Sequence, residues 1–116
     1  MSRVVFVDID HTICSGPPPG SKDYSNVLPY ETRIEAINDL YDKGHTIVYW
    51  TARGTMTGIS WFHETYKQLT EWGCKFHELR MGKPAFDVFI DDKVINSMEF
   101  FNDPAKSLEQ MGYSPT

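Results

Sequence analysis

The feature that most constrains the fold is a short apolar run followed by two carboxylates near the start of the chain. The run Val4–Val7 has four consecutive apolar residues, three of them β-branched, and predicts a strand buried on both faces. Asp8 and Asp10 follow it, and alternation along an extended chain points their side chains the same way. Because two buried like charges are unfavourable without a cation or a proton, the pair predicts a metal site, an acid/base pair, or both.

Strand and helix signals alternate along the rest of the chain. Apolar residues at helical spacing predict one helix over 30–43 and a second over 60–72, each closed by a glycine. Two further apolar segments predict strands over 45–50 and 86–90, and a weaker one lies over 74–79. The segment 94–111 indicates helix in pieces around Pro104.

This alternation predicts the α/β class, with right-handed crossovers and a mostly parallel sheet. At 116 residues the chain is expected to form a single domain over 1–116. The Gly- and Pro-rich segment 14–29 is long for a connecting loop and is a candidate functional flap. Residues 112–116 are expected to form a frayed tail.

Polar residues interrupt the apolar runs where the predicted strands end, and in parallel sheets ligands bind beyond those ends. They are Asp8, Asp10, Thr51, Arg53, Asp91 and Asp92, with Lys83 just before the last strand. Carboxylates from two strands form an oxygen-rich site that suits Mg²⁺, whereas no clustering of His and Cys supports zinc. A carboxylate can also attack phosphorus as a nucleophile, a second can move the protons, and a hydroxyl and an ammonium can hold phosphoryl oxygens. The residues therefore favour phosphoryl transfer.

Four motifs, in order, resemble the haloacid dehalogenase (HAD) superfamily. They read VFVDIDHT, IVYWTARG, GKPAFDV and VFIDD, and they span the chain from near its start to Asp92. Each motif alone is weak, but the ordered set is specific. The resemblance implies a three-layer Rossmann-like core and a Mg²⁺-dependent phosphohydrolase.

The resemblance also implies a role for each matching residue. Asp8 would be the nucleophile that becomes aspartyl-phosphate, Asp10 the general acid/base, Thr51 a hydrogen-bond donor to the phosphoryl group, and Lys83 the neutralising cation. The expected metal ligands are Asp8, Asp10 through its backbone carbonyl, Asp91 and Asp92. The expected substrate-binding residues are His11, Thr12, Ala52 and Arg53. His11 departs from the pattern because many members have Gly at this place.

Some of these residues have a second interpretation. Arg53 suits a substrate phosphate or carboxylate through its planar fork, but a surface salt bridge is as good an explanation. Asp92 could be a metal ligand, a partner of a ligand, or a helix N-cap.

No segment has room for an inserted domain, so the chain resembles capless members of the superfamily. It is similar to small phosphatases of capsular or surface polysaccharide synthesis and to short phage relatives. An open site would suit a large substrate, cover by a second subunit, or closure of the 14–29 flap over a sugar phosphate. A stripe of apolar residues over 61–72 fits either core packing or a subunit interface, which leaves a homo-oligomer open.

The bulk composition argues against several classes of binding partner. The net charge is −5 and no Lys/Arg run is present, which argues against nucleic-acid binding and against attachment to a membrane surface. No stretch approaches the ~18 apolar residues of a membrane span, and the first strand begins too early for a signal peptide. Cys14 and Cys74 lack metal-site spacing and are expected to be free thiols, which predicts a cytoplasmic protein.

The expected activity is hydrolysis of a small phosphorylated substrate such as a sugar phosphate. Two alternatives remain: a phosphatase for nucleotides or nucleic-acid 3′ ends, and a receiver-like phosphoacceptor or binding domain without hydrolysis. The missing basic stripe counts against the first. Against the second, the acidic pair DD comes last in the chain, and a long-lived phosphoaspartate would require Asp10 to be inert.

Overall fold

The structure, a computed structural model, describes residues 2–110 and divides them into two compact units. One unit is Ser2–Ala85, and the other begins at Phe86. Each is described by itself, and the prediction of a single domain stays a prediction. The helices and strands, in chain order, are β1 (Val4–Val7), α1 (Glu31–Asp42), β2 (Thr46–Trp50), α2 (Phe62–Glu71), β3 (Glu78–Arg80), α3 (Ser97–Asn102) and α4 (Pro104–Gln110).

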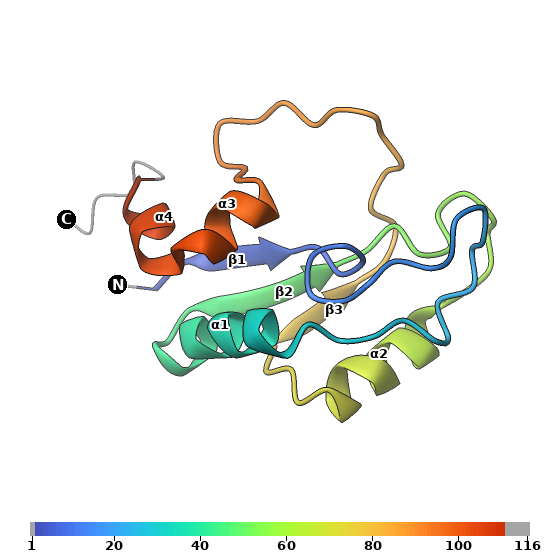
Figure 1. The fold of residues 1–116 in the computed structure, drawn as a ribbon, viewed down its shortest axis with the longest axis horizontal. Coiled ribbons are helices and arrows are strands. Elements are labelled where there is room, and N and C mark those ends of the chain that lie inside the picture. Colours follow the sequence, from blue (N-terminus) through green and yellow to red (C-terminus); the bar gives the residue numbers. More distant parts are fainter. Residues whose placement is uncertain (1, 111–116) are drawn as a thin grey trace. The chain divides into compact units, whose positions relative to one another are not determined.

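The first unit contains a parallel sheet of strand order β1-β2-β3 with two crossover helices (Figure 1). Val4 pairs with Thr46 at the start of the β1–β2 ladder, and Val48 pairs with Glu78 at the start of the β2–β3 ladder. Because every strand runs the same way, the segments after β1 and β2 begin at one edge of the sheet. This edge carries the candidate site.

The core of the first unit lies between the sheet and these helices. β2 is its centre, since Ile47, Val48 and Tyr49 are all buried. The predicted helix over 30–43 is confirmed as α1, which buries Ile34, Ile37 and Leu40 at helical spacing. On α2, Leu69 is fully buried in the core.

β1 and β3 differ from their predictions. β1 was expected to be buried on both faces, but Val4 and Phe6 are exposed and only Val7 is buried. Among the described strands β1 pairs with β2 alone, so it lies at an edge of the three-stranded sheet, where fewer neighbours cover its side chains. The strand predicted over 74–79 forms only as the short β3, because Cys74 and the residues just after it belong to the connection from α2.

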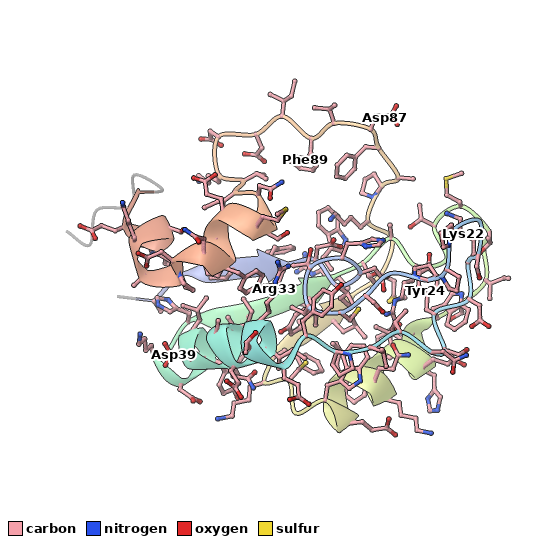
Figure 2. All side chains as sticks on the ribbon, in the orientation of Figure 1. Lys22, Tyr24, Arg33, Asp39, Asp87 and Phe89 are labelled. Atoms are coloured by element: carbon pink, nitrogen blue, oxygen red, sulfur yellow. The ribbon has the colours of Figure 1, made fainter. Side chains whose placement is uncertain are left out.

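The second unit contains α3, α4 and an extended segment before them, on which Figure 2 labels Asp87 and Phe89. The strand predicted over 86–90 is wrong: these residues form no strand, and Val88 and Ile90 are exposed. A strand needs a hydrogen-bonding neighbour, and an apolar run cannot specify one. The expected break of the C-terminal helix is confirmed, since α4 begins at Pro104, a position that needs no N–H donor. The tail predicted over 112–116 lies outside the described residues.

The α/β class, the parallel sheet and the absence of a cap are confirmed for residues 2–110. The predicted flap, 14–29, contains neither helix nor strand between its ends, where Cys14 and Pro29 form an isolated bridge. Within residues 2–110, none of the helices combines the length and the apolar character needed to cross a membrane.

Candidate active site

The segment after β1 forms a tight turn that presents both carboxylates. The Thr12 and Ile13 N–H groups donate to the Ile9 carbonyl, and the His11 N–H donates to the Cys14 carbonyl. His11 has φ of 62°, the left-handed region that favours glycine. The turn therefore requires a conformation that glycine adopts most readily, and His11 adopts it with a side chain.

Gly16 makes room for the His11 ring. A Cβ added at Gly16 would lie 2.0 Å from Nε2 of His11, so any other residue at 16 would displace the imidazole. The start of the flap and the turn at His11 are thus packed together.

Asp8 is the most accessible carboxylate of this edge. Its side chain is 36% exposed, Oδ1 lies 3.2 Å from the Lys83 ammonium, and Oδ2 accepts a hydrogen bond of 3.2 Å from the Thr12 hydroxyl. Arg33 of α1, labelled in Figure 2, donates a hydrogen bond to the Thr12 carbonyl and so stabilises the turn. The structure thus brings together three predicted site residues, Asp8, Thr12 and Lys83.

Asp10 has a different partner. Oδ2 accepts from Arg53 Nε at 2.9 Å and Oδ1 accepts from Arg53 Nη2 at 2.8 Å, which is a bidentate ion pair. The Arg53 side chain is fully buried and that of Asp10 is 16% exposed. The interpretation of Arg53 as a surface salt bridge is therefore wrong, because its guanidinium is fully buried. A role of Arg53 in substrate binding stays a prediction.

The segment just after β2 contains Thr51, Ala52 and Arg53, of which Arg53 bonds to Asp10. Thr51 is buried; its Oγ1 accepts from the Arg53 N–H, and its carbonyl accepts from the Lys83 N–H. The Thr55 hydroxyl donates to the Lys83 carbonyl, so both backbone groups of Lys83 are held. A hydroxyl oxygen that accepts one hydrogen bond can still donate its proton, so the Thr51 hydroxyl can also act as a hydrogen-bond donor. Ala52 lies between Thr51 and Arg53 and is half-buried.

Sequence reasoning missed Thr65, Gln68 and Tyr24. On α2, the Thr65 hydroxyl and Gln68 Oε1 both accept from Arg53 Nη1. Tyr24, on the flap, lies with the centre of its ring 4.9 Å from the Arg53 guanidinium carbon. One signal was present in the sequence: Thr65 stands one helical turn before Leu69 and is a polar residue on the apolar face of α2.

Asp91 and Asp92 belong to the second unit. Asp91 Oδ1 accepts the Lys93 N–H at 3.0 Å, and this hydrogen bond is the largest of the influences that lower the pKa of the Asp91 carboxyl. Their role as metal ligands stays a prediction.

The donor set suits a hard cation only in part. In the first unit, Asp8 offers a partly exposed carboxylate, and oxygen donors of this kind are what Mg²⁺ prefers. Over residues 2–110, however, no three side chains of His, Cys, Asp or Glu gather closely enough to hold a metal ion. Mg²⁺ often binds through one or two carboxylates, waters and substrate phosphate, so the Asp8 oxygens fit a metal that is completed by its substrate.

Both cysteines are free. Burial is the largest cause that raises the pKa of the Cys14 thiol, and the Asp10 carboxylate raises it further. Cys14 is therefore held as a neutral thiol beside Asp10, its Sγ 3.5 Å from Oδ1, and is a poor nucleophile.

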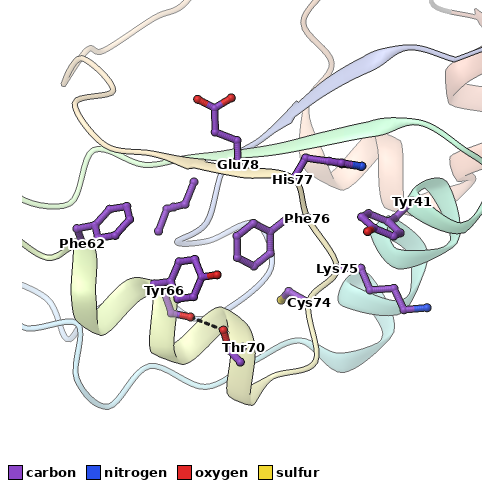
Figure 3. A pocket seen from close by; sticks show the side chains of 10 residues that line it. Tyr41, Phe62, Tyr66, Thr70, Cys74, Lys75, Phe76, His77 and Glu78 are labelled. Carbon is purple, nitrogen blue, oxygen red and sulfur yellow. Dashed lines mark hydrogen bonds between the residues drawn. The ribbon is translucent and has the colours of Figure 1, made fainter.

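An open pocket of about 350 Å³ lies elsewhere on the first unit. Its lining includes Tyr66 of α2 together with Phe76 and His77, which precede β3 (Figure 3). It contains none of the residues predicted for the site, so the candidate site and this pocket are separate.

Comparison with known proteins supports the fold. A crystal structure of a structural-genomics target from Vibrio cholerae is similar, with a TM-score of 0.80 and 26% sequence identity, and the match covers 94% of this chain and 95% of that chain. No family model matches the chain, and no curated protein matches it. The similarity extends over nearly the full length of both chains, so the α/β fold without an inserted cap is shared with a protein seen in a crystal.

Proposed function

We propose that this chain is a phosphomonoesterase that acts through an aspartyl-phosphate on Asp8, with Mg²⁺ as its cofactor. The observation that carries the proposal is the environment of Asp8: an accessible carboxylate, 3.2 Å from the Lys83 ammonium, on the turn that also contains Asp10. The ordered motifs that resemble the HAD superfamily support the same function. A structural ion pair would not require a second carboxylate two residues away with its own cation.

In the first half-reaction a carboxylate oxygen of Asp8 attacks phosphorus while the bond from phosphorus to the ester oxygen breaks. Asp10 is ionised in its pair with Arg53, so it must first take up a proton on a lone pair that Arg53 leaves free; it then gives that proton to the departing oxygen, which leaves as an alcohol. Lys83 offsets negative charge on Asp8 and on the phosphoryl oxygens, and the Thr51 hydroxyl donates to one of those oxygens. Mg²⁺, when bound at Asp8, would supply further positive charge at the phosphoryl group.

In the second half-reaction Asp10 takes a proton from water as the water oxygen attacks phosphorus. The bond between phosphorus and the Asp8 oxygen then breaks, inorganic phosphate leaves, Asp8 is again a free carboxylate, and Asp10 carries the proton that the next turnover needs. The bidentate hold of Arg53 on Asp10 supports this step, because it keeps the base in one orientation.

The proposed substrate is a small sugar phosphate or a related metabolite. No cap is inserted within Ser2–Ala85, and an uncapped site suits a small substrate over which the 14–29 flap closes. The net charge of −5 argues against a polyanionic partner. The two free thiols are typical of a reducing compartment, and we propose the cytoplasm.

The test is phosphate release from sugar phosphates, nucleotides, a 3′-phosphorylated oligonucleotide and p-nitrophenyl phosphate, each with Mg²⁺ or EDTA. The proposal expects Mg²⁺-dependent release that Asp8→Asn abolishes. Asp39→Asn is the matched control, since Asp39 is an exposed carboxylate paired with Lys43 on α1. Wild-type activity in Asp8→Asn would refute the assignment of Asp8 as the nucleophile. Preference for the oligonucleotide would favour a nucleic-acid phosphatase, and a stable phosphoprotein without turnover would favour a receiver-like domain.

A further inference from the structure

Every nitrogen of the Arg53 guanidinium has a partner. Nε and Nη2 donate to the two oxygens of Asp10, at 2.9 and 2.8 Å. Nη1 donates to the Thr65 hydroxyl at 3.1 Å and to Gln68 Oε1 at 2.6 Å. With 2% of the residue exposed, Arg53 joins the end of β1 to α2 rather than reaching into solvent.

Gln68 extends this connection to the flap. Its Oε1 accepts from Arg53, while its Nε2 donates to the Tyr24 carbonyl at 2.8 Å. The Tyr24 ring also covers the guanidinium. Both polar atoms of the Gln68 amide are therefore hydrogen-bonded, and this one residue of α2 connects Arg53 to the flap.

We propose that α2 positions the Asp10 carboxylate through Arg53, with Thr65 and Gln68 as positioning residues. A guanidinium bonded only to Asp10 could move together with it, because the Arg side chain has several rotatable bonds. The two acceptors on α2 fix the third nitrogen, and a planar group fixed at all three nitrogens has one orientation. The Asp10 oxygens then have one position relative to the Asp8 turn.

The consequence for catalysis rests on the proposed function. Proton transfer needs Asp10 within hydrogen-bonding reach of the departing oxygen and of the attacking water, and a displacement of about 1 Å can cost about a hundredfold in rate. Weakening the α2 acceptors should therefore slow the steps that need proton transfer, and Thr65 and Gln68 would act on these steps through Arg53.

Gln68→Met and Thr65→Val test this, since each removes the acceptor and keeps a similar volume. For an alkyl phosphate, whose leaving alkoxide needs a proton, we expect kcat/KM to fall about tenfold or more. For p-nitrophenyl phosphate, whose leaving group departs as the anion, we expect a loss of less than about threefold. Lys67→Ala, on the exposed face of the same helix, is the matched control and should leave both values unchanged. An equal loss with both substrates, or no loss, would overturn the proposal.

A second measurement separates this inference from the proposed function. Gln68→Met and Asp10→Asn are combined, and the unfolding equilibrium constants of the single and double variants are compared in urea. If Arg53 links the two sites, the effects are not additive, and the double variant departs from the product of the singles by about threefold or more. Additive effects would overturn the link whether or not the protein hydrolyses phosphate. If wild-type protein hydrolyses neither ester, the proposed function fails, and this coupling alone decides the inference.

Discussion

Replacing Arg53 by Met should destabilise the protein far more than the loss of a typical ion pair. The substitution keeps the aliphatic stem but leaves the Asp10 carboxylate, 16% exposed, without its cation, and it also leaves the Thr65 hydroxyl and Gln68 Oε1 without their donor. Breaking a buried pair by removing one partner costs about 3–5 kcal/mol, against about 0–1 kcal/mol for an exposed pair. We expect the larger range, since the Arg53 side chain is fully buried.

Urea unfolding followed by tryptophan fluorescence measures this free energy. Lys43→Met is the control, because the exposed Lys43–Asp39 pair on α1 should contribute about 0.3–0.5 kcal/mol. The double variant Asp10→Asn/Arg53→Met should recover part of the loss, since it removes the unpaired charge. A loss below about 1 kcal/mol in Arg53→Met, or no recovery in the double variant, would refute the buried pair.

Four further outcomes are expected. Asp10→Asn should slow hydrolysis of the phosphoenzyme, so that a radiolabelled aspartyl-phosphate accumulates from an aryl phosphate; no trapped label would contradict a two-step mechanism. Lys83→Ala should lower kcat/KM by more than about tenfold, which is about 1.4 kcal/mol, and a smaller loss would leave Lys83 as a turn residue. Gly54→Ala should lower the free energy of unfolding more than Gly58→Ala: both glycines have positive φ, but a Cβ at Gly54 would lie 2.1 Å from the Ile59 carbonyl oxygen, whereas one at Gly58 would meet nothing within 4 Å. Burial raises the pKa of the Cys74 thiol to about 11, so this thiol ionises at lower pH in the unfolded chain than in the folded protein. The free energy of unfolding should therefore fall as pH rises from 9 toward 11, and Cys74→Ala should reduce that fall. The same pH dependence in wild type and Cys74→Ala would contradict the raised pKa.

The elements near the candidate site could be predicted because their signals are local. The helical spacing of Ile34, Ile37 and Leu40 predicts α1, and the apolar run before Thr51 predicts β2. A parallel sheet brings the carboxyl ends of its strands to one edge, which is why Asp8 and Thr51, far apart in sequence, could be expected at the same edge. Their catalytic roles stay predictions.

What could not be predicted depends on long-range partners. Whether Arg53 faces solvent or a buried carboxylate is decided by α2, and the sequence around Arg53 contains no sign of Thr65 or Gln68 as its acceptors. The segment 86–90 is a second example: its apolar residues predict a strand, yet none of the described strands pairs with it. Apolar character indicates a tendency to be buried, but only the assembled chain supplies the neighbour.

The Arg53–Asp10 pair also discriminates between alignments of β1 and β2 during folding. The native ladder sets Val7 beside Tyr49, and the ion pair forms just beyond the ends of both strands. A slip of one residue would shift Arg53 by about 3.3 Å relative to Asp10, more than a bidentate hydrogen bond can absorb, and would also turn the side chains of the strand to the opposite face. A misaligned sheet would therefore separate the Arg53 guanidinium, which is fully buried in the native pairing, from its carboxylate, and an unpaired buried charge costs about several kcal/mol. The same ion pair that orients Asp10 thus selects one pairing of the strands over its near neighbours, which favours a single folded state.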